Sequence, residues 1–237
     1  MTSHWQEELL HVVDSEPDQA TVFTAVAAAA HALGFEHCAY GLRLPVPVTQ
    51  PRTLLLNNYP LPWQQRYQAA GYLHIDPTVA HCRRSTAPLV WDESLFLQAR
   101  PLWDEAQQHG LGVGWAKSHF DANGVGGMFT LARCADPISS SELQTNRLKM
   151  VWLTHVAHMA LSRHITLQAA KPLPALTERE VEVLKWTADG KTTSEIADIL
   201  ELSDNTVNFH IKNSISKLGT TNKTAAAVRA ALLGLFN

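Results

Sequence analysis

Cysteine is scarce in this sequence, with three residues in a chain of 237: Cys38, Cys82 and Cys134. Their odd number and wide spacing argue against a disulfide framework and against a CxxC-type zinc site, and they fit a reducing cytoplasm. The GxGxxG, P-loop and HExxH motifs are also absent. His155 and His158 lie three residues apart, but no acid or cysteine completes a metal set. We therefore expect no metal, no cofactor and no enzymatic activity.

Long hydrophobic runs are missing as well. No apolar stretch reaches the roughly 18 residues that a membrane span needs, and the opening residues MTSHWQEELL lack the basic and apolar segments of a signal peptide. We therefore expect a cytoplasmic protein with no membrane partner. The apolar content of 46% is sufficient for a core, and the charged content of 17% is too low for a disordered chain. A length of 237 residues suits two domains.

Acidic residues are absent from the last part of the chain. The whole chain carries a net charge of −3, and from residue 171 onward eight Lys and Arg balance eight Asp and Glu. Between Asn205 and Asn237, however, there is no acid and there are four cations, which are Lys212, Lys217, Lys223 and Arg229. A neutral domain with one cationic face can still bind the phosphates of a nucleic acid.

One domain boundary is clear. A helical pattern runs from about residue 139 to 167, beginning with the capping box Ser139-Ser-Ser-Glu142. Its apolar stripe consists of Leu148, Val151, Trp152, Val156 and Met159. The segment QAAKPLPAL follows with two prolines, which interrupt a helix. We therefore predict a first domain over residues 1–167, a linker over 168–175 and a second domain over 176–237.

The first domain has the pattern of an α/β fold. Predicted helices cover residues 4–13, 18–33, 60–70, 76–84 and 101–109, and predicted strands cover 37–44, 51–57, 89–91, 112–120 and 125–133. The last two strands flank an Asp-Ala-Asn-Gly turn, which is typical of an antiparallel hairpin. Strands flanked by helices predict an α-β-α sandwich with a central antiparallel sheet.

The second domain is predicted to be all-α, with four helices. Thr177 and Thr192 each precede a glutamate three residues later, which marks two helix starts, and Gly190 ends the first helix. Ser203 begins the third helix, whose core positions are Val207, Ile211, Ile215 and Leu218. Two short helices, a tight turn and a longer third helix with a polar outer face form a helix-turn-helix.

The third helix of this module would enter the major groove of double-stranded DNA. Its outward candidates are Asn205, Thr206, Asn208, Lys212 and Asn213. Asn amides suit adenine, and Lys suits guanine or phosphate. Thr193 and Lys223, together with Thr177, Arg179 and Lys191, are predicted to position the domain on phosphates. The alternative is an ordinary solvated helix face.

The string T-E-R-E-x-E-V-L-K-W-T-A-x-G-K-T-x-x-E-I-A, continued by L-S-x-x-T-V-N-F-H-I, resembles the DNA-binding domain of the LuxR family of regulators. The resemblance is dense over 60 residues. Glu180, Leu184 and Gly190 recur in that family, and we expect structural roles for them as capping acid, core leucine and helix stop. Many members have Lys where this chain has Asn208. We therefore expect this helix to recognise DNA more through side-chain amides and less through positive charge.

Motifs in the first domain extend the resemblance. These are N-Y-P-L-P-W-Q-Q-R-Y at 58–67, I-D-P at 75–77, V-W at 90–91 and a glycine in GLGVGW. They are similar to the acyl-homoserine-lactone-binding domain of quorum-sensing receptors in the LuxR family. The resemblance implies that the ligand is bound by Tyr59, Trp63, Tyr67, Asp76, Pro77, Trp91, Gly114 and Thr130.

The chemistry of these residue types suits such a lactone, which has two carbonyls, one amide N–H and an alkyl tail. The indole N–H of Trp63 would donate to the lactone carbonyl and the hydroxyl of Tyr59 to the amide carbonyl. The carboxylate of Asp76 would accept from the amide N–H. Tyr67 and Trp91 would form aromatic walls.

The remaining site residues have narrower roles. Thr130 would reach a 3-oxo or 3-hydroxy group on a ligand that has one. The tail lining is expected to include Val79, Leu89, Leu102 and Trp103. Structural alternatives stay open: Asp76-Pro77 is a common helix start, Gly114 suits a close-packed strand, and Trp63 or Trp91 suits a core.

The resemblance further implies a homodimer, joined through the helix at 139–165 and the last helix at 224–235. Such a dimer would bind an inverted-repeat operator and, as a transcription regulator, would meet RNA polymerase. Two other interpretations share this architecture. One is a solo regulator that senses a different small molecule, and the other is a constitutive dimeric DNA-binding protein.

Overall fold

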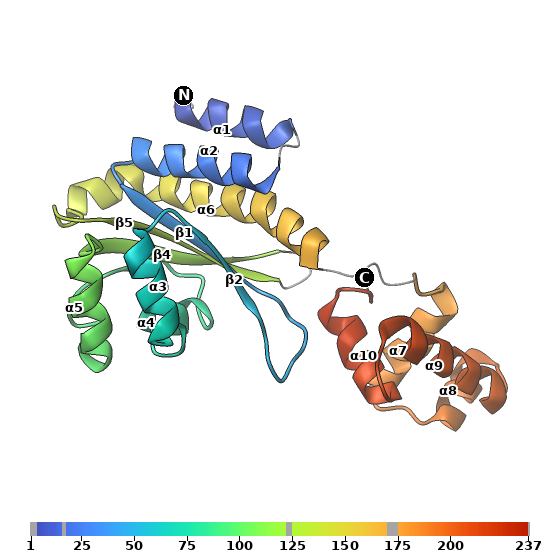
Figure 1. Cartoon of the computed structure of the whole chain (residues 1–237). Coiled ribbons are helices and arrows are strands. Elements are labelled where there is room, and N and C mark those ends of the chain that lie inside the picture. Colours follow the sequence, from blue (N-terminus) through green and yellow to red (C-terminus); the bar gives the residue numbers. More distant parts are fainter. Residues whose placement is uncertain (1–3, 16–17, 122–124, 170–174, 237) are drawn as a thin grey trace. The chain divides into compact units, whose positions relative to one another are not determined.

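The computed structural model describes residues 4–15, 18–121, 125–169 and 175–236. The chain forms two compact units, the first made of residues 1–44, 53–121 and 125–167 and the second built around residues 168–237 (Figure 1). Most of the predicted linker, residues 170–174, falls outside the described residues. Each unit is described by itself.

The first unit contains a five-stranded antiparallel sheet. Its strands are β1 (His37–Arg43), β2 (Thr53–Asn57), β3 (Leu89–Val90), β4 (Val113–Phe120) and β5 (Gly126–Arg133), in the order β2-β1-β5-β4-β3. The hairpin of β4 and β5 is confirmed, with Phe120 opposite Gly126, although its turn at 122–124 lies outside the described residues.

Helices cover both faces of this sheet, as predicted for an α-β-α sandwich (Figure 1). One face carries α1 (His4–Asp14), α2 (Gln19–Ala32) and α6 (Ser140–Ala169), and the other carries α3 (Leu61–Ala69), α4 (Pro77–Cys82) and α5 (Arg100–Gln108). Short 3-10 helices span Tyr72–His74 and Leu97–Ala99. The largest core lies between the sheet and helices α2 and α6. An aromatic-rich second core lies on the face of α3 and α5.

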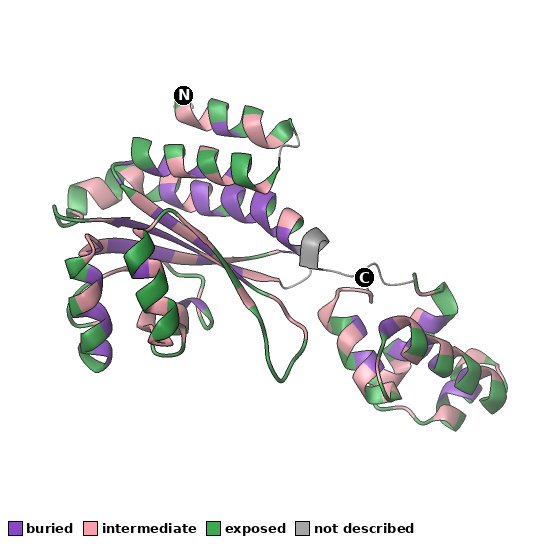
Figure 2. Ribbon diagram, in the orientation of Figure 1, coloured by how far each residue is buried: buried purple, intermediate pink, exposed green. Residues whose placement is uncertain are grey.

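The apolar stripe of the long helix α6 is only partly buried. Val156 is buried, but Leu148 is 80% exposed and Met159 is 50% exposed. The buried residues of α6 are Met150, Leu153, Val156, Ala157, Ala160, Leu161 and Ile165, together with Thr154, His158 and Ser162. Figure 2 shows the buried side of this helix in purple. Because this inward face includes polar residues, the spacing of apolar residues alone could not identify it.

The second unit has the four predicted helices, α7 (Glu178–Ala188), α8 (Thr193–Leu200), α9 (Asp204–Leu218) and α10 (Lys223–Leu232). Both capping boxes form, Thr177 with Glu180 and Thr192 with Glu195. Ser203 caps α9, and Gly219 ends it at φ 60°. These local signals fix the helix starts and explain why the sequence located them accurately.

Within the described ranges, no helix combines the length and apolar character that crossing a bilayer requires. Nor do those residues bring three His, Cys, Asp or Glu side chains together in a way that would hold a metal ion.

Candidate ligand pocket and nucleic-acid interface

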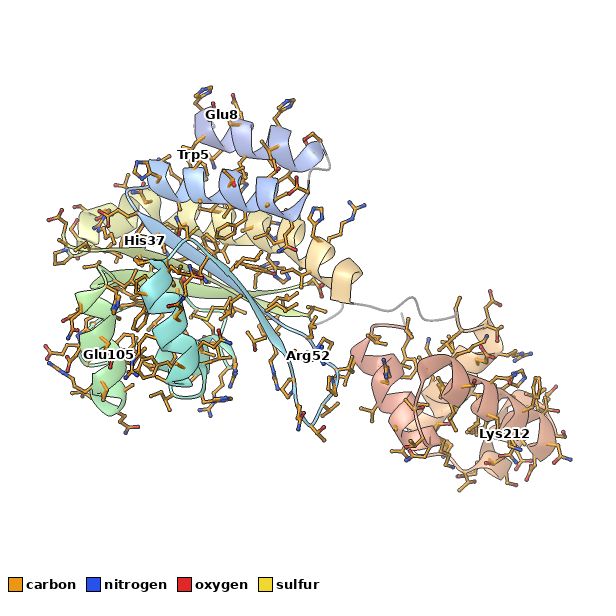
Figure 3. The ribbon with its side chains drawn as sticks, viewed as in Figure 1. Trp5, Glu8, His37, Arg52, Glu105 and Lys212 are labelled. Atoms are coloured by element: carbon orange, nitrogen blue, oxygen red, sulfur yellow. The ribbon has the colours of Figure 1, made fainter. Side chains whose placement is uncertain are left out.

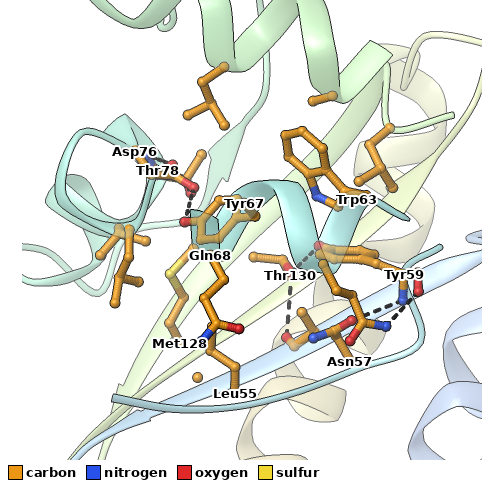
Figure 4. A pocket seen from close by; sticks show the side chains of 18 of the residues that line it. Leu55, Asn57, Tyr59, Trp63, Tyr67, Gln68, Asp76, Thr78, Met128 and Thr130 are labelled. Carbon is orange, nitrogen blue, oxygen red and sulfur yellow. Dashed lines mark hydrogen bonds between the residues drawn. The ribbon is translucent and has the colours of Figure 1, made fainter. Parts of the chain in front are cut away.

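A cavity of about 530 Å³ lies between the sheet and helices α3, α4 and α5 of the first unit (Figure 4). Its floor is the sheet, where the strand register places Asn57, Ala39 and Thr130 in one row and Leu55, Gly41 and Met128 in the next. All six residues line the cavity. Because β1 contributes only alanine and glycine to these rows, the middle of the floor stays hollow.

Tyr59 reaches the cavity from the turn between β2 and α3. Its hydroxyl lies 2.8 Å from the hydroxyl of Thr130, which lies 3.4 Å from the carbonyl of Ala39. The turn is held by Asn57, which accepts from the Tyr59 amide, and by Gln64, which donates to the Tyr59 carbonyl. Burial raises the pKa of Tyr59 above its usual range, so the phenol stays neutral. The bond from Thr130 to Ala39 is long, and when Thr130 donates to Tyr59 in its place, the phenol O–H can donate into the cavity.

Asp76 caps α4 and also lines the cavity. Its carboxylate accepts from the backbone N–H of Thr78 at 2.8 Å, from the Thr78 hydroxyl at 2.6 Å and from the Tyr67 hydroxyl at 2.8 Å. The helix-start interpretation is thus confirmed, with Pro77 at the first helical position. Both bonds from Thr78 fall on Oδ1, and Tyr67 bonds to Oδ2, so Oδ2 can accept one further donor from the cavity. Burial raises the pKa of Asp76, and the bonds from Thr78 and Tyr67 oppose this effect.

Trp63 forms part of the cavity wall on α3. It is buried among aromatic rings, with Tyr67 at 5.8 Å, Tyr72 at 6.0 Å and His109 at 5.4 Å between ring centroids. Figure 4 shows its indole nitrogen directed into the cavity. Among the described residues, this N–H makes no hydrogen bond. An indole nitrogen can only donate, so the cavity presents an unused donor here.

Trp91 lines the cavity next to β3, and Gly114 determines its position. The Trp91 amide donates to the Gly114 carbonyl at 2.8 Å. A Cβ atom at position 114 would lie 2.6 Å from Cε2 of Trp91 and closer still to Cδ2 and Cε3. The Trp91 indole therefore packs directly against the backbone of Gly114. The buried Nε1 of Trp91 has no partner among the described residues.

The structure brings together six of the eight predicted ligand residues. Tyr59, Trp63, Tyr67, Asp76, Trp91 and Thr130 line the cavity. Pro77 and Gly114 do not: the first starts α4 and the second supports Trp91, so the structure gives them no contact with the cavity. Of the expected tail residues, Val79, Leu102 and Trp103 line the cavity and Leu89 does not.

Several lining residues were missed by the sequence analysis. They include Asn57, Gln64, Gln68, Thr78, Leu55 and Met128. One of them could have been found, because Met128 lies two residues from Thr130 on β5 and so shares its face. The others come from β2 and from helices α3 and α4, whose orientation toward the cavity the sequence pattern does not indicate.

The second unit carries the predicted nucleic-acid face on α9. Asn205, Asn208 and Lys212 are exposed, Thr206 and Asn213 are partly exposed, and Lys212 points outward (Figure 3). The Thr206 hydroxyl lies 2.8 Å from that of Ser203, so it helps to cap the helix. Thr193 and Lys223, both partly exposed, are the first residues of α8 and α10. The sequence analysis missed Phe209, which is exposed beside Asn208.

One cation of the C-terminal run is internal. Lys217 donates to Glu180 at 2.8 Å and to the carbonyl of Ala175 at 2.9 Å. Burial acts to raise the pKa of Glu180, but the bonds from Lys217 and Thr177 outweigh it and hold that pKa below its usual range. The structural role predicted for Glu180 agrees with this geometry, and Lys217 is not available to phosphate.

Comparison with known proteins gives two family matches. Residues 18–161 match the autoinducer binding domain, and residues 174–230 match the bacterial regulatory proteins of the luxR family. The transcriptional activator protein AnoR of Acinetobacter nosocomialis is 42% identical over 98% of this chain and 99% of its own length. The transcriptional activator protein SolR of Ralstonia solanacearum is 42% identical over 97% of this chain and 98% of its own length.

Solved structures agree with this comparison. A crystal structure of Escherichia coli SdiA has a TM-score of 0.85 and 37% identity, covering 98% of each chain. A structure of SdiA in complex with octanoyl-rac-glycerol has a TM-score of 0.84 and 35% identity, covering all of this chain and 98% of the other.

Proposed function

We propose a ligand and a target for this chain, which belongs to the LuxR family of bacterial transcription regulators and carries an autoinducer-binding domain. The ligand is an N-acyl-homoserine lactone. The target is an inverted-repeat operator in double-stranded DNA, bound by a homodimer in quorum sensing. The observation that carries the ligand proposal is the set of unused polar groups in the cavity, on Tyr59, Trp63 and Asp76.

Each unused group has one counterpart in the lactone head. The free N–H of Trp63 donates to the lactone carbonyl. The Thr130 hydroxyl turns from the Ala39 carbonyl to donate to Tyr59, and the Tyr59 hydroxyl donates to the amide carbonyl. The last acceptor site of Asp76 takes the amide N–H. Leaving one such group unpaired in a buried site costs about 1–3 kcal/mol, so the complete set favours this head group.

The rest of the cavity suits an acyl tail. Its wall includes the side chains of Leu55, Leu73, Val79, Leu102 and Met128. A volume of about 530 Å³ lies within the range of small-molecule sites, about 300–1,000 Å³. A tail that fills this space becomes part of the second core, and binding of this kind stabilises the folded protein by mass action.

A second ligand class deserves a test because SdiA has been solved with octanoyl-rac-glycerol. This acyl glycerol shares the tail but has an ester where the lactone has an amide. It offers Asp76 no amide N–H, and only a hydroxyl of the flexible glycerol could donate there. The carboxylate is therefore the group that distinguishes the two ligands.

The ligand test compares Asp76→Asn with Asp92→Asn, an exposed control outside the cavity. N-octanoyl-homoserine lactone should bind the wild type and the control equally. It should bind Asp76→Asn about 10–100-fold more weakly, because a hydrogen bond to a charged group contributes about 1.5–3 kcal/mol. Calorimetry measures these affinities. Equal lactone affinity in all three proteins, or tighter binding of octanoyl glycerol by the wild type, would reject the lactone.

The homodimer proposal uses the exposed side of α6. Leu148, Trp152 and Met159 are spaced by four and seven residues, so they share one side of the helix. Leu148 and Met159 are exposed and Trp152 is partly buried against Trp5. A second copy would cover this side, and a two-fold dimer matches a two-fold operator. RNA polymerase is the expected partner at the promoter.

The target test uses sedimentation and gel shift of the full-length protein with a duplex selected from a random pool. We expect two chains per duplex and lactone-dependent binding. Leu148→Glu should yield monomers, whereas Leu97→Glu, an exposed leucine elsewhere in the first unit, should not. Equal DNA affinity with and without lactone would instead favour a constitutive DNA-binding protein.

A further inference from the structure

The outward face of α9 carries an aromatic side chain that does not pack in the core of the domain. Phe209 is 61% exposed, the highest exposure of any large hydrophobic residue in the described part of the second unit. Its ring contacts that of His210 at 5.7 Å between centroids, and it is absent from both hydrophobic cores of that unit.

Helix geometry explains this exposure. Val207 and Ile211 are buried and mark the inward side of α9. At about 100° per residue, Phe209 lies about 160° from each of them, on the opposite side of the helix. A change of rotamer cannot bring the ring to the core, so any side chain at position 209 is exposed in the isolated domain.

The neighbours of Phe209 on this side are polar and cationic. Asn205, Asn208, Phe209 and Lys212 follow the spacing of three and four residues that places side chains in one stripe. All four are exposed, and the sequence from Asn205 to its end contains no acid. This surface complements the phosphates and base edges of DNA better than it complements an apolar protein partner.

We infer that Phe209 reads a thymine methyl group in the major groove, between base contacts made by Asn208 and Lys212. This inference rests on the proposed binding of an operator by α9. A phenyl ring cannot bond to the polar edges of bases, and the thymine C5-methyl is the apolar group that base pairs present in that groove. Phe209 thus specifies one A·T pair in each half-site.

The test removes the methyl group without changing any hydrogen bond. The full-length protein, with a mixture of butanoyl, octanoyl and dodecanoyl homoserine lactones, first selects a duplex from a random pool. Each thymine of that duplex is then replaced singly by deoxyuridine, and Kd is measured. One replacement per half-site should weaken wild-type binding about fourfold, equivalent to ~0.8 kcal/mol for one methyl group.

Variants assign the effect to the side chain. Phe209→Ala should bind the thymine and deoxyuridine duplexes equally. Phe209→Leu should keep part of the difference, because it keeps an apolar contact. Ile199→Ala, which truncates an exposed apolar residue of α8, should keep all of it. Because Phe209 is exposed, thermal melting should show all three variants as stable as the wild type.

Three outcomes would overturn the inference. One is a wild type that is insensitive to every replacement, and another is a difference that persists unchanged in Phe209→Ala. The third is a uniform loss of affinity in Phe209→Ala on all duplexes, which would indicate packing on the sugar-phosphate backbone. In each of these the operator proposal stands. Failure to select any duplex would reject the operator proposal itself and this inference with it.

Discussion

The contact between Gly114 and Trp91 allows a prediction whose size follows from the geometry. In Gly114→Ala, the new Cβ would lie 2.6 Å from Cε2 of Trp91 and closer still to two further ring atoms. Carbon atoms at optimal separation are about 3.5–4.0 Å apart. The indole must therefore move by about 1 Å or more, away from β4. Overpacking of this kind costs about 1–3 kcal/mol.

The assay is a double-mutant cycle measured by thermal unfolding. Gly114→Ala alone should lower Tm by about 2–12 °C, since 1 kcal/mol corresponds to about 2–4 °C in a protein of this size. In the Trp91→Leu background the clashing ring is gone, so the same substitution should be neutral or should stabilise slightly by restricting the unfolded chain. The coupling between the two sites should thus be about 1–3 kcal/mol.

A matched control is available on the same sheet. A Cβ at Gly41 would lie 3.1 Å from Cδ2 of Leu55, the end of a flexible side chain. Gly41→Ala should therefore cost less than Gly114→Ala and should not couple to Trp91→Leu. Additive effects of Gly114→Ala and Trp91→Leu would refute the argument that Gly114 positions the indole.

Three further predictions concern buried polar groups. Trp63→Phe should weaken lactone binding about 5–100-fold but change the Tm of the unliganded protein little, because the Trp63 N–H makes no hydrogen bond to the described residues. Calorimetry measures the affinity and thermal melting the stability. Equal lactone affinity in both proteins would contradict this prediction. Lys217→Met should lower the free energy of unfolding by about 1.5–3 kcal/mol, because it leaves Glu180 without its cation. Lys185→Met, on an exposed face, should not lower it. Urea titration of the two variants measures the difference. His158 should make the free energy of unfolding depend on pH. Burial lowers the pKa of His158 from 6.5 to about 4, so the unfolded chain binds a proton more readily than the folded one. Up to about 3 kcal/mol of the free energy of unfolding is therefore lost as pH falls from 6.5 to 4. His158→Leu should remove most of the pH dependence of the free energy of unfolding in that range. An unchanged pH dependence would show that the His158 imidazole is not its cause.

Local signals explain how much of the fold the sequence predicted. The capping boxes at Thr177 and Thr192 involve residues three apart, and both are formed as expected. The strand alternation around residues 113–133 likewise predicted the hairpin. Such features depend on the chain within one or two turns, so the pattern of residue types is sufficient to find them.

The buried side of α6 was not predictable in the same way. The apolar stripe read from the sequence includes Leu148 and Met159, yet both are exposed. Buried Thr154 satisfies its hydroxyl within its own helix, bonding to the Met150 carbonyl. His158 bonds to the hydroxyl of Tyr40, 118 residues away. A buried polar residue needs such partners, and their presence is a tertiary fact.

The sequence by itself determined that this chain has a regulator's helix-turn-helix and a domain with Tyr59, Trp63 and Asp76 in it. Only the tertiary structure decided which polar groups are already paired. Tyr59 meets Thr130 across 71 residues, and Tyr67 occupies one acceptor site of Asp76. Hydrogen bonds form over about 3 Å, and residue spacing along a chain does not set distances between strands and helices. The remaining donors and acceptors, which select the ligand, are therefore a property of the fold.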